Sequence, residues 1–290
     1  MSQIDQFVSG ESIAASVMMV RKAQPSPRPV VLVEGDKDRR VLRTTLRSLA
    51  DVVPGAGKAV TLDTLNYINI EECKAWLLVV VDADFDRILG LHHPELVLLT
   101  DSHDMDVEHI RSPSLNKVVQ EICSSQKCKK LFTVSPGEDL DKVSDAIRAV
   151  LISLAQPIGL LRLISAQQDL GLAFKKIDHS KIVKKASLSI DVTALINVIL
   201  AAGAKPGVTS AVLRTELTTA EGAGHDPWQI CQGHDLDKLF VLAVRRYWGI
   251  GKLSVDEVER SMRLAYETTH FWRSHLGEAI IERLRKMRAY

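Results

Sequence analysis

The stretch Trp76–Asp86, WLLVVVDADFD, decides the fold of this chain. It holds an unbroken apolar run that stops at Asp82, and Asp84 and Asp86 follow directly. A short run of branched apolar residues is typical of a strand buried on both faces, as in a parallel sheet covered by helices. Ligands of open α/β sheets bind beyond the carboxyl ends of the strands, which is where these acids stand.

Two further predicted strands also end on acids. Pro29–Val33, PVVLV, is followed by Glu34, and Leu96–Thr100, LVLLT, is followed by Asp101. Helical patterns separate the strands, and this alternation predicts a parallel sheet whose strand ends lie along one edge. Crowded carboxylates stay ionised together when a cation lies between them, and hard oxygen ligands favour Mg²⁺ or Mn²⁺. The sequence therefore predicts an acidic metal site, although solvated loops and helix starts are also rich in aspartate.

Composition restricts the compartment and the partners. The 290 residues carry a formal net charge of +1, which gives no bulk attraction to nucleic acid or membrane. The four cysteines form no CxxC pair, as expected for reduced thiols in a cytoplasmic protein. The N-terminus has no signal-peptide pattern, and we find no apolar stretch of the about 20 residues that a membrane span needs. We expect a cytoplasmic protein with no membrane partner.

Two short motifs have competing interpretations. GAGKA, Gly55–Ala59, is not a P-loop, because Val52 stands where the first glycine belongs and Ala59 replaces the hydroxyl residue. Lys58 is then either a turn residue or a cation near the acidic edge. The GHD motif places His234 and Asp235 at a helix start, where we favour a structural role over contact with a substrate phosphate or a metal ligand.

Helical periodicity replaces the strand and helix alternation from Ser114 onward. We predict a catalytic domain with an N-terminal helix over residues 1–125, and a mainly helical domain over residues 126–290 for dimerisation or for substrate or partner binding. Within the second domain we expect a long helical stretch, Leu140–Gln168, interrupted at Pro157. The apolar segment LGLAFKKID, residues 170–178, could form a strand.

The segments VEGDKD, VVDADFD and TDSHDMD together resemble the TOPRIM domain of topoisomerases, primases and OLD-family nucleases. Glu34 followed by Asp38 also fits the ExxxD variant of the OLD nucleases. The stand-alone TOPRIM effectors of anti-phage defence, the AriB subunit of the PARIS system and its relatives, have a similar GHD motif in a helical second half. Relatives tend to have a glutamate where Asp106 stands, so the third ligand stays open among Asp101, Asp106 and Glu108.

This resemblance implies a Rossmann-like TOPRIM sheet and a Mg²⁺- or Mn²⁺-dependent endonuclease. The implied catalytic residues are Glu34, Asp82 and Asp84. The implied metal ligands are Glu34, Asp38, Asp82, Asp84, Asp101 and Asp106. The resemblance further implies an RNA target, tRNA in particular, rather than DNA, a partner ABC-type ATPase that restrains the nuclease until a phage trigger is sensed, and an active homodimer.

Two other function classes fit the same acids. One is a non-catalytic TOPRIM-like module whose acids bind magnesium for folding or for partner docking. The other is a receiver-like phosphoacceptor, which also carries acids at its strand ends. Against the receiver, this chain places a glutamate first and has no lysine at the expected final strand.

Overall fold

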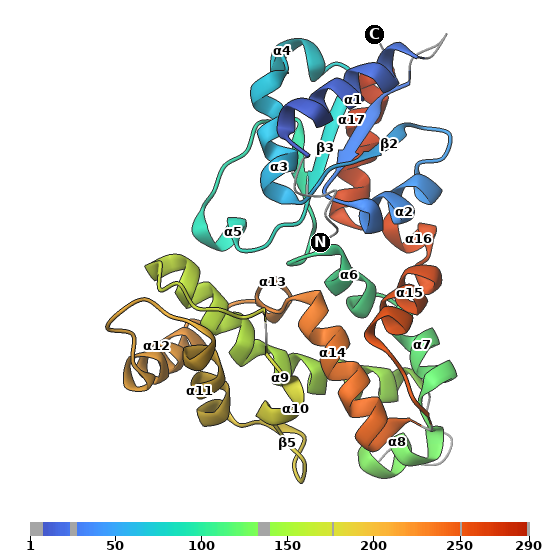
Figure 1. The fold of residues 1–290 in the computed structure, drawn as a ribbon. Coiled ribbons are helices and arrows are strands. Elements are labelled where there is room, and N and C mark those ends of the chain that lie inside the picture. The colour runs from blue at the N-terminus through green and yellow to red at the C-terminus, as the bar shows by residue number, and fades with distance from the viewer. Residues whose placement is uncertain (1–7, 24–27, 133–139, 176, 250, 289–290) are drawn as a thin grey trace. The chain divides into compact units, whose positions relative to one another are not determined.

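The computed structural model describes residues 8–23, 28–132, 140–175, 177–249 and 251–288 (Figure 1). The chain divides into two compact units. Unit 1 consists of Met1–Ala83, Leu91–Asp101 and Glu267–Tyr290, and unit 2 consists of Asp84–Gly90 and Ser102–Tyr266. The predicted division at residue 125 therefore falls inside unit 2, and the C-terminal segment belongs to unit 1.

Unit 1 is built around a parallel sheet with the strand order β2-β1-β3-β4. β1 (Val30–Val33) pairs with β2 (Asp51–Pro54) on one side and with β3 (Leu77–Val81) on the other, and β3 pairs with β4 (Val97–Leu99). All residues of β1 and β3 are buried, because their valines and leucines are packed on both faces of the sheet. The predicted α/β class and parallel sheet are confirmed.

Helices flank this sheet. Ile13 and Val17 of the first helix belong to the same apolar core as Val30 and Leu32 of β1. The C-terminal helix packs against β4, although unit 2 separates the two along the chain. The helical elements are α1 (Gly10–Lys22), α2 (Asp36–Thr45), α3 (Lys58–Asp63), the 3-10 turn η2 (Thr64–Tyr67), α4 (Ile70–Cys73), α16 (Thr268–Phe271) and α17 (His275–Arg288).

Unit 2 is helical, and α9 (Leu140–Gln168) is its longest element. The predicted interruption at Pro157 is wrong, because α9 continues through this residue. Proline removes one backbone hydrogen bond from a helix. The flanking residues Leu154, Ile158 and Leu161 are all buried in the core of unit 2, and such packing usually supplies more stability than local propensity.

By length and composition alone, α9 is also apolar enough to cross a membrane. This differs from the expectation that no apolar stretch would be long enough to span a membrane. Half of its most apolar window is buried within the chain. Its apolar residues form part of the core of unit 2, as expected for the central helix of a helical unit.

The other elements of unit 2 precede or follow α9 along the chain, and most of them are short. The predicted strand over residues 170–178 is wrong, since the described residues of that segment form no strand. A two-stranded antiparallel hairpin lies just after it. The remaining elements are α5 (Asp86–Leu89), α6 (Met105–Arg111), α7 (Ser114–Ile122), α8 (Ser125–Phe132), α10 (His179–Ile182), β5 (Val183–Lys184), β6 (Ser189–Ile190), α11 (Val192–Ala202), α12 (Ser210–Gly222), α13 (Pro227–Ile230), α14 (Gly233–Ala243), the π-helical turn η3 (Val244–Trp248) and α15 (Val255–Ala265).

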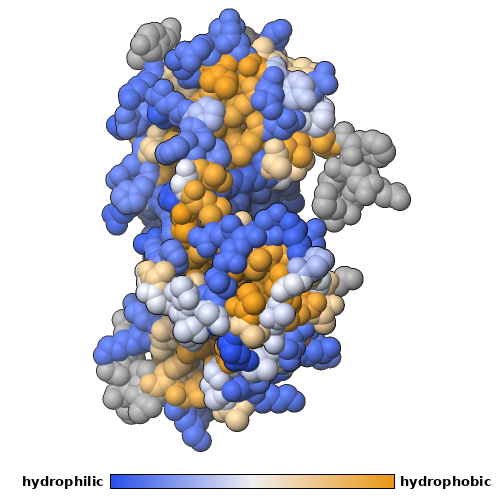
Figure 2. Space-filling model, turned by 90° about the vertical axis from the view of Figure 1, so that its left-hand side faces the viewer, coloured by the Kyte–Doolittle hydropathy of each residue, from blue (hydrophilic) through white to orange (hydrophobic). Residues whose placement is uncertain are grey.

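Exposed apolar side chains are scattered among elements of both units. On the face that Figure 2 displays, hydrophobic patches are bordered by hydrophilic residues. The large apolar residues that are most exposed are Met19, Tyr67, Leu91, Leu131, Val212 and Leu264. Single exposed apolar residues are normal on protein surfaces, and they provide useful controls for substitutions in the core.

We expect Leu32→Ala to lower the free energy of unfolding of unit 1 by about 2 to 5 kcal/mol, because Leu32 is fully buried in β1 and its loss leaves a cavity. The same substitution at Leu264, which is 81% exposed, should change the free energy by less than about 0.5 kcal/mol. Urea unfolding followed by tryptophan fluorescence measures both values. Equal effects at the two positions would contradict the assigned core.

Candidate metal centre

The carboxyl ends of β1 and β3 bring the first two acidic segments together in unit 1. The register pairs Val33 with Val80, so the chain leaves both strands at the same edge. The Glu34 carboxylate then accepts a hydrogen bond from the backbone N–H of Asp82, with 3.2 Å between Oε2 and N. This is the convergence of strand ends that the sequence predicts.

Lys58 carries a positive charge to the same edge. It begins α3 directly after Gly57, whose φ of +88° lies in the region that favours glycine. Its ammonium group donates a hydrogen bond to the carbonyl oxygen of Ala83 at 3.3 Å. The N–H of Ala83 donates to Thr100 Oγ1 at 2.9 Å, which fixes the loop after β3. Of the two interpretations of Lys58, this geometry supports a cation near the acidic edge.

Two other predicted ligands in unit 1 bind backbone groups at helix starts. Asp38 accepts a hydrogen bond from the N–H of Gly35 at 3.0 Å, at the beginning of α2. Asp101 accepts one from the N–H of Leu276 at 2.9 Å, in the first turn of α17. These two bonds fix the position of each carboxylate at the start of a helix.

Asp84 belongs to unit 2, where His103 holds it. The backbone of Asp84 has a φ of +46°, a conformation that aspartate tolerates better than most residues. Its N–H donates to the carbonyl oxygen of His103 at 2.7 Å, and its carboxylate lies 3.7 Å from Nε2 of the same residue. Nδ1 of that buried ring is 3.1 Å from the carbonyl oxygen of Gln229, so it donates there. His103, which the sequence analysis did not identify, therefore holds Asp84 in place.

Asp106 lies with two acids that were not predicted as ligands. One carboxylate oxygen from each of Asp106, Asp237 and Glu259 lies within 4.8 Å of the other two. Asp237 and Glu259 are only 1% and 4% exposed. This buried acidic cluster could hold a metal ion.

A sequence signal for these two acids exists. Asp237 stands three and four residues before the buried Phe240 and Val241, and thus on the apolar stripe of its helix. Glu259 similarly precedes the buried Met262 by three residues. An acid on a core-facing stripe needs a partner, because burying an isolated charge is costly.

Asp104 caps the N-terminus of α6 and neighbours Asp106 of this cluster. Its carboxylate accepts hydrogen bonds from the N–H groups of Val107 and Gly233, both at 2.8 Å. Burial, together with the neighbouring charge of Asp106, raises the pKa of Asp104 to about 8. A large share of Asp104 therefore keeps its proton at neutral pH, which reduces the repulsion among the acids of this region.

The two polar residues of the GHD motif, His234 and Asp235, contact different partners. Asp235 is buried and accepts from Arg162 at 2.6 Å, and it lies 3.1 Å from Nε2 of His179. Burial alone would raise the pKa of Asp235, but the hydrogen bonds and charges of His179 and Arg162 lower it below the ordinary value. His234 is half exposed and places Nδ1 3.2 Å from the Glu259 carboxylate. The geometry supports the structural role of Asp235 and places His234 next to the acidic cluster.

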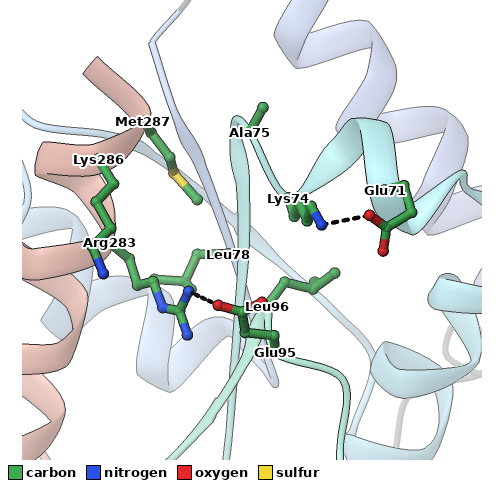
Figure 3. A pocket seen from close by; sticks show the side chains of 9 residues that line it. All are labelled: Glu71, Lys74, Ala75, Leu78, Glu95, Leu96, Arg283, Lys286 and Met287. Atoms are coloured by element: carbon green, nitrogen blue, oxygen red, sulfur yellow. Dashed lines mark hydrogen bonds and ion pairs between the residues drawn. The ribbon is translucent and has the colours of Figure 1, made fainter. Parts of the chain in front are cut away.

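A separate pocket of about 380 Å³ opens in unit 1 at the amino end of β3. Figure 3 shows two of its basic side chains paired with acidic neighbours: Arg283 pairs with Glu95, and Lys74 pairs with Glu71. Leu78 near the start of β3 lines the pocket, whereas Asp82 follows the other end of that strand. The pocket is thus distinct from the acidic edge, and its three cations, Lys74, Arg283 and Lys286, each pair with a carboxylate.

No model of a known protein family matches the sequence, and no curated protein matches it. The site is therefore interpreted from its own residues. In unit 1 these are Glu34, Asp82 and Lys58, whose contacts lie at one sheet edge. In unit 2 they are the acids around Asp106.

We expect Asp235→Asn to destabilise unit 2 by about 3 kcal/mol at pH 7, because it removes the charge of a buried carboxylate that pairs with Arg162 and contacts His179. A lowered pKa stabilises the fold above the ordinary value of 3.8, and this contribution is lost as the pH falls through the lower folded pKa. The difference between the variant and the wild type should therefore shrink below about pH 4. Urea unfolding at several pH values measures it.

The matched control is Asp145→Asn, which removes an exposed partner of Arg148. Surface ion pairs contribute about 0 to 1 kcal/mol, so this variant should stay close to the wild type. If both variants lose the same free energy, the structural role assigned to Asp235 is wrong.

Proposed function

We propose that the protein is a metal-dependent endonuclease of the TOPRIM type. The contact between the Glu34 carboxylate and the N–H of Asp82, at the ends of adjacent parallel strands, carries this proposal. It joins the glutamate of VEGDKD to the DxD of VVDADFD, the two segments with the clearest TOPRIM resemblance. Neighbouring strand ends are also where α/β proteins build their sites.

The donor set fits a hard divalent cation. Glu34 and Asp82 offer carboxylate oxygens at one sheet edge, and Asp38 and Asp101 are further oxygen donors of unit 1. Oxygen donors of this kind suit Mg²⁺ or Mn²⁺. Asp84 completes the DxD motif and is proposed as a ligand on the resemblance. When bound, the ion would neutralise charge on a phosphate and lower the pKa of an attacking water.

Residues of the chain at this sheet edge could bind a phosphodiester and assist its cleavage. The N–H of Asp82 holds the Glu34 side chain, which can also act as a general acid or base. Lys58 places its ammonium group at the loop after Asp82, where it can attract a phosphate. Without an ion, the acids would repel the nucleic acid backbone, so we expect binding and cleavage both to depend on the metal.

The biological setting that we propose follows the family resemblance. The target is RNA, with tRNA favoured over DNA, and the protein acts in the cytoplasm as the toxic effector of an anti-phage system. A partner ABC-type ATPase restrains it until a trigger is sensed, and the active form is a homodimer. GAGKA is not a P-loop, so ATP control of this nuclease would come from that partner.

The alternative is a non-catalytic magnesium-binding module of the same fold. The bonds from Asp38 and Asp101 to backbone N–H groups favour it, because they give these acids a structural task. The two functions differ in one observable result. The module binds metal without cutting nucleic acid, whereas the endonuclease does both.

We expect Glu34→Gln to lower the rate of Mg²⁺-dependent tRNA cleavage by about 100-fold or more, because the substitution removes a metal ligand or a general base. The assay uses the purified full chain without the ATPase, with total tRNA, and with single-stranded DNA in a parallel arm. EDTA should abolish cleavage of tRNA. The matched control Glu72→Gln alters an exposed glutamate and should leave the rate unchanged.

Each other result has a defined meaning. Cleavage by Glu34→Gln at the wild-type rate rejects the assigned site. Metal binding without cleavage supports the non-catalytic module. Faster cleavage of DNA than of tRNA rejects the proposed target class.

A further inference from the structure

We propose that Asp106, Asp237 and Glu259 bind a divalent cation, Mg²⁺ or Mn²⁺, that joins three helices of unit 2. The three acids come from α6, α14 and α15, which pack against one another in pairs. This site lies entirely within unit 2 and shares no residue with the Glu34 and Asp82 edge of unit 1. The inference is therefore independent of the endonuclease proposal.

The negative charges of these three acids, two of which are buried, need a nearby positive charge. One oxygen from each carboxylate lies within 4.8 Å of the others, and two of the three side chains are almost fully buried. Ionised carboxylates at this separation repel one another strongly outside bulk water. The side chain of Asp106 is 22% exposed, so a hydrated ion could reach the cluster from its side.

Two ionisable side chains lie beside Glu259. Arg263 Nη1 lies 3.7 Å from the Glu259 carboxylate, and His234 Nδ1 lies 3.2 Å from it. Both of these contacts are made to Glu259.

His109 gives a second, independent indication of a ligand. Its ring is 1% exposed, and within the described part of the chain neither ring nitrogen has a hydrogen-bond partner. Nδ1 points at the cluster from 3.6 Å, measured to Asp106 Oδ1, while the ring edge contacts Tyr266. A buried imidazole facing a carboxylate is the arrangement that orients metal-ligating side chains from behind.

Gly233 lets the helices come close enough for the site. A Cβ atom added at this position would lie 2.4 Å from Cβ of Asp106, which real structures do not tolerate. The N–H of Gly233 also binds Asp104 at 2.8 Å. The start of α14 can therefore lie directly on α6, which brings Asp237 to Asp106.

The donor atoms decide the class of ion. Three carboxylate oxygens from three helices are hard ligands, and no thiolate is among them. Mg²⁺ and Mn²⁺ accept such a partial set and complete it with water, whereas Ca²⁺ usually takes six to eight oxygens from a more complete cage. An ion bound only by the folded unit must also stabilise it.

The test measures Mn²⁺ binding to the full chain carrying Glu34→Gln and Asp82→Asn, which weaken the other candidate site. We expect this background to bind one ion per chain by titration calorimetry, and Mn²⁺ to raise its unfolding temperature. Adding Asp106→Asn should weaken binding by at least about tenfold and remove most of the rise. Adding Asp256→Asn, an exposed acid of α15, should change neither result.

Asp106 is chosen because it is the most exposed of the three ligands, and circular dichroism checks that the variant is folded. Asp237→Asn is the second variant and should show the same loss. If the background binds no Mn²⁺, the histidines and Arg263 neutralise the acids by themselves and the proposal is overturned. Binding that is unchanged in folded Asp106→Asn overturns it equally.

Discussion

The parallel pairing of β1 with β3 is the constraint on which the acidic edge depends. Because both strands run in one direction and are buried on both faces, polar residues are admitted only where the strands stop. Glu34 and Asp82 meet at that point, although three α-helices, a 3-10 turn and the strands β2 and β3 lie between them along the chain. Antiparallel pairing would send the two acids to opposite ends of the sheet.

The two units compensate their acids in different ways. In unit 1, backbone N–H groups bind Glu34, Asp38 and Asp101, and these bonds hold the side chains in place without removing their charge. In unit 2, the raised pKa of Asp104 lets it keep a proton, and Asp235 is balanced by an arginine and a histidine. Fixed dipoles leave a carboxylate available to a cation, whereas full ion pairing does not.

The sequence predicted the sheet well, because valine runs such as Val30–Val33 have few other stable environments. It also placed Glu34 and Asp82 at one edge of the sheet, because the carboxyl ends of parallel strands lie at the same edge. It could not show that α17 packs on β4, because helical periodicity identifies a buried face but not its neighbour. Asp237 and Glu259 were missed for a similar reason: each is a single acid on an apolar stripe, and only folding brings them to Asp106.

Helix α17 is translated after all of unit 2, yet it covers β4 and its first turn binds Asp101. On the ribosome, β4 would wait uncovered while the helices of unit 2 emerge and begin to fold. The contact of Asp101 with α17 would then form only after unit 2 has been translated. A nascent chain that ends before α17 would accordingly lack the bond between Asp101 and the N–H of Leu276.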